Sequence, residues 1–158
     1  MAQSPGFDQV QRLYLEDLQV GQRFTSGTHA IDEAQIKAFA REFDPQPFHL
    51  DEEAAKTSLF GRLVASGWHT AAITMRLLTE SVPIANGVIG SGGESIWPRP
   101  TLPGDILTVT SVIEEITPSR SRPERGRVLM RSETRNQRDE IVQTLTSRLV
   151  VLRRPGTS

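Results

Sequence analysis

Length, composition and charge limit the classes of protein to consider. The chain has 158 residues and a formal net charge of -1, which predicts a single domain and argues against nucleic acid as the main partner. It contains no cysteine, which excludes disulfides, iron–sulfur clusters and cysteine nucleophiles. Three scattered histidines without cysteine predict no metal site.

Hydropathy argues against a membrane protein. The uncharged stretch 63–75 falls short of the roughly 18–20 residues needed to cross a bilayer. The N-terminus shows no basic segment followed by an apolar one, so no secretory signal is predicted and the expected location is the cytoplasm. Of the histidines, His29 and His69 have no carboxylate at a suggestive spacing and are interpreted as structural or surface residues.

The first half of the chain carries the predicted helices. Residues 1–13 are expected to form a polar tail, and residues 23–31 a strand. Asp32 can cap the helix that follows, with Gln35 at the position of a capping box. Apolar residues then recur at the spacing of an amphipathic helix as far as Phe43.

Proline and small residues divide the next segment. Pro45 ends the first helix because proline disfavours helical geometry in the residue before it, so residues 44–50 are predicted to be a loop. Asp51 is expected to cap a short second helix. Residues 68–80 form a longer helix with apolar side chains on nearly every face, which is typical of a buried helix.

The second half of the chain reads as strands. Alternating and β-branched residues predict four of them, at 88–97, 106–116, 127–136 and 141–152. Their connections are short enough for antiparallel neighbours. The predicted fold class is therefore α+β, with an antiparallel sheet wrapped around the long helix. Such a sheet has an exposed edge, which dimerisation can cover.

Three residues near the start of the long helix are candidates for a catalytic site: Asp44, His49 and Gly67. A carboxylate and an imidazole in one proline-stiffened loop can hold a water molecule, or act as a paired general acid and base. The backbone N–H of Gly67 is a free donor of the first helical turn and can face a carbonyl oxygen. Each also has a structural explanation: Asp44 can end its helix, His49 can bond a backbone carbonyl, and Gly67 can serve a turn.

Around these residues the sequence resembles the MaoC-like dehydratase family, which includes the (R)-specific enoyl-CoA hydratases. The resemblance rests on FDPQPFHLD at 43–51, VASGW at 64–68 and WPRP at 97–100. It covers residues 14–152 and leaves 153–158 as a C-terminal tail.

The resemblance implies a hotdog fold, an antiparallel sheet around a long central helix, which normally occurs as dimers or as double-hotdog pairs. It also implies reversible hydration of a trans-2-enoyl-CoA to a 3-hydroxyacyl-CoA, with coenzyme A as part of the substrate and no separate cofactor. By position, Asp44 and His49 would hold water and move its protons, and the amide of Gly67 would bind the thioester oxygen. The length fits one hotdog protomer, so a shared site is expected to need two chains.

Four further residues are expected to bind substrate: Gln46, Ser66, Trp68 and Arg99. The hydratases commonly have Asn at the position of Gln46 and His at the position of Ser66, so these departures bear on which substrate is used. Trp68 can belong to the core or line an acyl tunnel. Arg99 can contact a phosphate of coenzyme A, and a surface arginine beside two prolines is an equal alternative.

Two other functions compete with hydration. Hotdog folds also host thioesterases, and fold alone does not decide function. The chain can also be a non-catalytic subunit that binds acyl-CoA. The Asp44 and His49 pair favours the hydratase over both.

Overall fold

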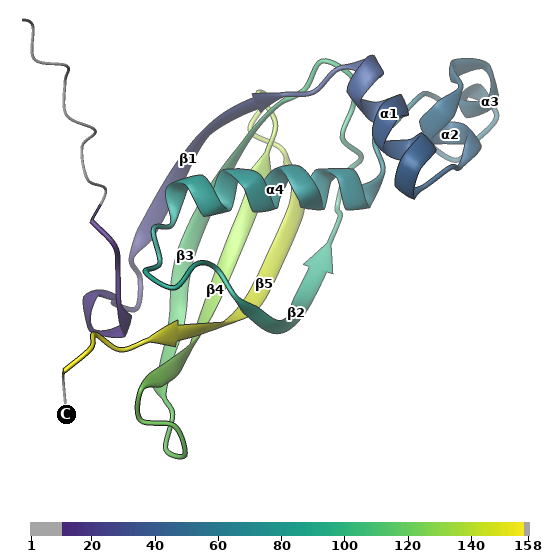
Figure 1. Cartoon of the computed structure of the whole chain (residues 1–158). Coiled ribbons are helices and arrows are strands. Elements are labelled where there is room, and N and C mark those ends of the chain that lie inside the picture. The colour runs from purple at the N-terminus through teal and green to yellow at the C-terminus, as the bar shows by residue number, and fades with distance from the viewer. Residues whose placement is uncertain (1–10, 157–158) are drawn as a thin grey trace, which may run out of the picture.

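The computed structural model describes residues 11–156 (Figure 1). Most of the expected N-terminal tail (1–13) and the last two residues of the expected C-terminal tail lie outside the described residues. Of the tail residues that are described, Leu13 forms a bridge with Ile84. Among the described residues, no helix is both long enough and apolar enough to cross a membrane.

Helices fill the first half of the chain and strands the second, as predicted. A short 3-10 helix η1 (Leu15–Asp17) and strand β1 (Arg23–Ala30) come first. They are followed by helices α1 (Glu33–Phe43), α2 (Pro47–Leu50), α3 (Glu52–Lys56) and α4 (Gly67–Ser81). The remaining strands are β2 (Gly90–Ile96), β3 (Ile106–Pro118), β4 (Arg125–Arg135) and β5 (Ile141–Leu152).

The five strands form one sheet in the order β1-β3-β4-β5-β2, and each neighbouring pair is antiparallel. Figure 1 shows α4 lying across one face of the twisted sheet, with α1, α2 and α3 grouped at the end where α4 begins. A sheet wrapped around one long helix is the predicted hotdog arrangement. Strands β1 and β2 are its edges.

The helix ends follow the predicted capping residues. Asp32 and Asp51 accept hydrogen bonds from the backbone N–H groups of Gln35 and Glu53, and so cap α1 and α3. The prediction of a loop over residues 44–50 is wrong, because α2 forms one helical turn there. The reason is the second proline: at the first position of a helix, its fixed backbone angle favours the turn and its missing N–H costs nothing.

Helix α4 is buried on one face only, which corrects the prediction of a helix buried all round. Ile73, Leu77 and Leu78 pack against the sheet within two apolar clusters. On the opposite face, Trp68 and Met75 are 65% and 43% exposed. The single chain therefore exposes two large apolar side chains on the outer side of α4, whose later turns also expose the ion pair of Arg76 and Glu80.

Strand β2 lies close to its neighbour β5. A Cβ atom at Gly93 would overlap the carbonyl oxygen of Thr146 on β5, whereas a Cβ atom at Gly27 on β1 would meet no atom within 4 Å. Strand β2 therefore needs glycine at position 93 in order to pair with β5.

We predict that Gly93→Ala destabilises the protein by about 1–3 kcal/mol, because the backbone of β5 must move to admit a methyl group. The matched control Gly27→Ala should change the free energy of unfolding by no more than about 0.5 kcal/mol. Urea denaturation of the two variants measures both values. Equal effects of the two substitutions would contradict the close approach of β2 to β5.

Candidate active site

Two short backbone contacts place the segment before α4 between α2 and the loop that follows β2. The N–H of Val64 donates to the carbonyl oxygen of Phe48 at 3.1 Å, and the N–H of Ala65 donates to that of Thr101 at 2.9 Å. Helix α2, which carries His49, is thereby fixed beside the start of α4. The three sequence segments that resemble the dehydratase family meet here.

The ring of His49 is buried and held by a backbone carbonyl. Its Nδ1 lies 2.6 Å from the carbonyl oxygen of Val64. Because a carbonyl oxygen can only accept a hydrogen bond, Nδ1 must carry a proton. The other ring nitrogen, Nε2, then has a free lone pair in the neutral ring, and it lies 3.3 Å from Oδ2 of Asp44.

Asp44 ends α1, and its carboxylate is held on both oxygens. Gln46 donates from Nε2 to Oδ1 at 2.6 Å, and the hydroxyl of Ser66 donates to Oδ2 at 2.7 Å. Burial alone would raise the pKa of Asp44, but these two hydrogen bonds and the nearby His49 outweigh burial and lower the pKa below its usual value. Asp44 is therefore a carboxylate at neutral pH.

The first turn of α4 leaves one backbone donor without a partner among the described residues. Trp68 N–H donates to the side chain of Ser66, and the N–H groups of His69 and Thr70 donate to its carbonyl oxygen. The N–H of Gly67 has no such acceptor within residues 11–156. A Cβ atom at Gly67 would lie 3.0 Å from the ring of Trp97, so close packing also favours glycine here.

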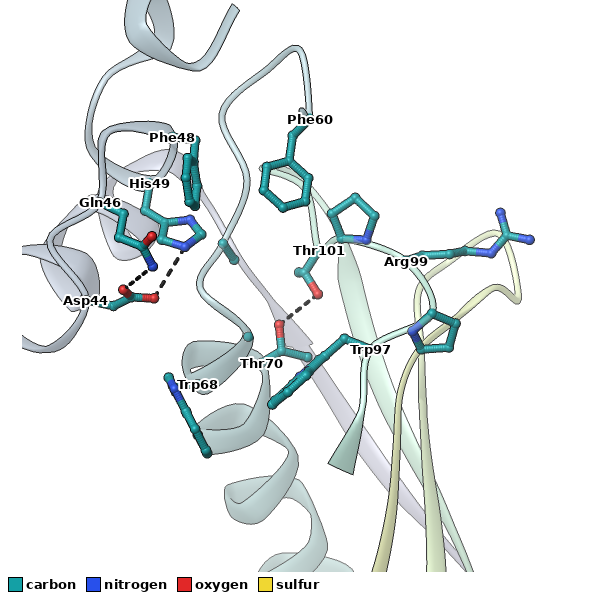
Figure 2. Close-up of a pocket in the computed structure, with 14 residues that line it drawn as sticks. Asp44, Gln46, Phe48, His49, Phe60, Trp68, Thr70, Trp97, Arg99 and Thr101 are labelled. Atoms are coloured by element: carbon teal, nitrogen blue, oxygen red, sulfur yellow. Dashed lines mark hydrogen bonds and ion pairs between the residues drawn. The ribbon is translucent and has the colours of Figure 1, made fainter. Parts of the chain in front are cut away.

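These groups surround a cavity of about 480 Å³ (Figure 2). Six of the seven residues predicted for the site line it: Asp44, Gln46, His49, Gly67, Trp68 and Arg99. The seventh, Ser66, is completely buried behind Asp44 and does not line the cavity. The structure thus brings together a carboxylate, an imidazole and a free backbone N–H at one opening.

Arg99 lies at the rim of the cavity rather than beside the other polar groups. Its guanidinium is 2.8 Å from a carboxylate oxygen of Glu140, and in Figure 2 it points away from Asp44 and His49. Contact with a phosphate would have to compete with this ion pair.

The aromatic wall and the floor of the cavity include residues that were not predicted for the site. Trp97 packs edge-on against Trp68 and donates from Nε1 to buried Gln143 at 2.8 Å. Thr70 and Thr101 share a hydrogen bond of 2.9 Å beneath the opening. Trp97 and Thr101 could have been suspected from their place in WPRPT, and Thr70 from its place on the inner side of the long helix. Phe48 and Phe60 complete the apolar lining.

Comparisons with known proteins identify the family. The family model of the MaoC like domain matches residues 17–135. The chain belongs to this family of dehydratases and hydratases, as the resemblance indicated.

Three relatives illustrate the range of similarity. The crystal structure of a MaoC-like dehydratase from Rhodospirillum rubrum is 62% identical, covers 90% of this chain and 99% of its own, and has a TM-score of 0.89. The R-hydratase PhaJ1 of Pseudomonas aeruginosa is 26% identical, with coverage of 90% and 88% and a TM-score of 0.74. A 3-hydroxybutyryl-CoA dehydratase of Methylorubrum extorquens is 30% identical over 115 residues, or 70% of this chain and 69% of that protein.

A second histidine near the site is kept neutral by burial. The ring of His69 stacks on Phe39 at 4.6 Å and is only 7% exposed. Burial, with a smaller contribution from His29 and His49, lowers the pKa of His69 from 6.5 to about 4. This agrees with its interpretation as a structural residue.

We predict that His69 makes the protein less stable in mild acid. Above pH 6.5 the residue is neutral in both states; as the pH falls towards about 4, only the unfolded chain binds the proton. The loss of stability over this range should amount to about 3 kcal/mol, and His69→Leu should remove it. Urea denaturation at a series of pH values measures the difference. An unchanged pH dependence in the variant would contradict the assignment.

Proposed function

We propose that the protein catalyses the reversible hydration of a trans-2-enoyl-CoA to a 3-hydroxyacyl-CoA. The observation that carries the proposal is the distance of 3.3 Å between Nε2 of His49 and the carboxylate of Asp44, at a cavity that Gly67 also lines. This reaction needs a base, a negatively charged group that holds water, and a hydrogen-bond donor for the oxyanion.

The proposed reaction uses the lone pair of Nε2. Water lies beside both Nε2 of His49 and the carboxylate of Asp44, within hydrogen-bonding reach of each, and one of its protons moves to Nε2 as its oxygen bonds to C3 of the enoyl group. The electrons of the double bond move onto the thioester oxygen, where the N–H of Gly67 stabilises the developing negative charge. The imidazolium then returns the proton to C2, so that H and OH have both been added and the histidine is neutral again.

The state of the carboxylate fits this role. Asp44 remains ionised because Gln46 and Ser66 donate to it, and an ionised carboxylate stabilises the imidazolium that forms on His49. The names of the relatives supply the reaction class, since one is an R-hydratase and another a 3-hydroxybutyryl-CoA dehydratase. The aromatic wall of the cavity offers an apolar surface to an acyl chain.

We predict that Asp44→Asn and His49→Gln each lower kcat for crotonyl-CoA hydration at least about 100-fold. His49→Gln removes the group that takes and returns the proton, and Asp44→Asn removes the negative charge that holds water and stabilises the imidazolium. The matched control His29→Gln changes a histidine outside the cavity and should keep activity within about twofold. Loss of enoyl absorbance measures turnover, and circular dichroism checks that each variant folds.

The same assay separates the competing functions. Release of free thiol from a saturated acyl-CoA, without loss of enoyl absorbance, would replace hydration with thioester hydrolysis. Binding of short, medium and branched enoyl-CoAs without turnover would make the chain a non-catalytic subunit. Near-wild-type turnover by either site variant would contradict the roles given to Asp44 and His49.

We further propose that the active form is a homodimer or a higher homo-oligomer. Strand β2 is an open sheet edge, and the outer face of α4 exposes Trp68 and Met75. Unpaired edges and apolar helix faces are surfaces that a second copy can cover.

Sedimentation velocity tests the assembly. Wild-type protein should sediment as two or more chains, and Met75→Glu should shift it towards the monomer, because a charge would be buried at the contact. The control Val20→Glu changes an exposed apolar residue distant from α4 in the chain and should leave the assembly intact. A fully active monomer would contradict the proposal.

A further inference from the structure

Ser66 makes two contacts with a single hydroxyl group. Its Oγ donates to Oδ2 of Asp44 at 2.7 Å and accepts from the N–H of Trp68 at 3.2 Å. The side chain is completely buried, so neither contact is shared with solvent. Ser66 therefore joins the carboxylate directly to the first turn of α4.

The first contact also fixes the carboxylate relative to the imidazole. The oxygen that Ser66 holds, Oδ2, is the one that lies 3.3 Å from Nε2 of His49. Gln46 holds the other oxygen, Oδ1. With both oxygens engaged, the carboxylate cannot rotate without breaking a hydrogen bond.

The second contact concerns the neighbouring backbone. Gly67 follows Ser66 directly and lines the cavity, and its N–H has no acceptor among the described residues. Because Ser66 caps the turn that begins with Gly67, the carboxylate and this N–H are held at a fixed separation. An ordinary N-cap has no such second role: Asp51 caps α3 without contacting Asp44.

We propose that Ser66 is a positioning residue that fixes the carboxylate of Asp44 against both the imidazole of His49 and the N-terminus of α4. This rests on the proposed hydratase function. It also gives a physical meaning to the two departures from the hydratase pattern, since Gln46 and Ser66 are the two residues that hold Asp44. Ser66 acts through Asp44 and does not touch the substrate.

The inference predicts a specific change in the titration of Asp44. Removing the hydroxyl of Ser66 takes away one of the hydrogen bonds that lower the pKa of this carboxyl, so the pKa should rise. Three side chains contact the carboxylate: His49 from α2, which can be charged, and the neutral Gln46 and Ser66. The substitution changes only Ser66.

The test compares Ser66→Ala, Ser66→Gly and Ser66→Thr. Glycine is almost as good an N-cap as serine, so the glycine variant loses the contact with Asp44 while the helix remains capped. In the alanine and glycine variants we expect kcat to fall about tenfold to a hundredfold with KM within twofold, and the titration of Asp44 to move to higher pH. Threonine keeps a hydroxyl and should restore both kcat and the titration.

A control variant and a direct titration complete the experiment. Asp51→Ala removes a helix cap that does not touch Asp44, so its kcat and its Asp44 titration should match the wild type. Carbon-13 NMR of protein labelled at aspartate follows the carboxyl of Asp44 without any substrate, so this arm holds even for a protein that does not hydrate enoyl-CoA. An unchanged Asp44 titration in Ser66→Gly, or a loss expressed only in KM, would overturn the positioning role.

Discussion

The buried hydrogen bond between Nδ1 of His49 and the carbonyl oxygen of Val64, 2.6 Å long, is the constraint on which the site depends. It places a proton on Nδ1 and turns Nε2 towards Asp44 and the cavity. A flipped ring would set a carbon atom against the carbonyl and leave a buried acceptor without a donor, which is costly. One backbone oxygen therefore determines which ring nitrogen can exchange protons with a substrate.

The fold supports this bond by fixing both of its ends. The segment that contains Val64 is paired with Phe48 on one side, and through Ala65 with Thr101 on the other. Its continuation becomes α4, whose inner face packs into the apolar clusters beneath the sheet. The carboxylate, the imidazole and the first turn of α4 thus behave as one unit, and the long helix anchors that unit to the core.

The residues of the site that lie in short sequence motifs, and the order of the helices and strands, could be predicted from the sequence. Asp44, His49 and Gly67 could be found because they lie within short motifs around one helix start. The partner of Nδ1 could not be read in the same way, since a backbone carbonyl leaves no mark on residue type and Val64 lies 15 positions away. The aromatic wall at Trp97 likewise depends on how the segment after β2 folds back over α4.

The wrong expectations also have physical causes. A pair of prolines around residues 45–47 suggested a loop, but the second one begins a helical turn that carries His49 inwards. A helix with apolar side chains on nearly every face suggested complete burial, but periodicity cannot distinguish a face that the same chain covers from one that it leaves exposed. The exposure of Trp68 and Met75 is visible only once the sheet is in place.

The most direct test of this account is the protonation of His49 itself. Nitrogen-15 NMR of histidine-labelled protein, with the ring signals assigned by their loss in His49→Gln, reports which nitrogen carries the proton in the neutral ring. The account predicts a protonated Nδ1 and an unprotonated Nε2. A neutral ring with its proton on Nε2 would contradict it, because His49 would then have no lone pair to offer beside Asp44.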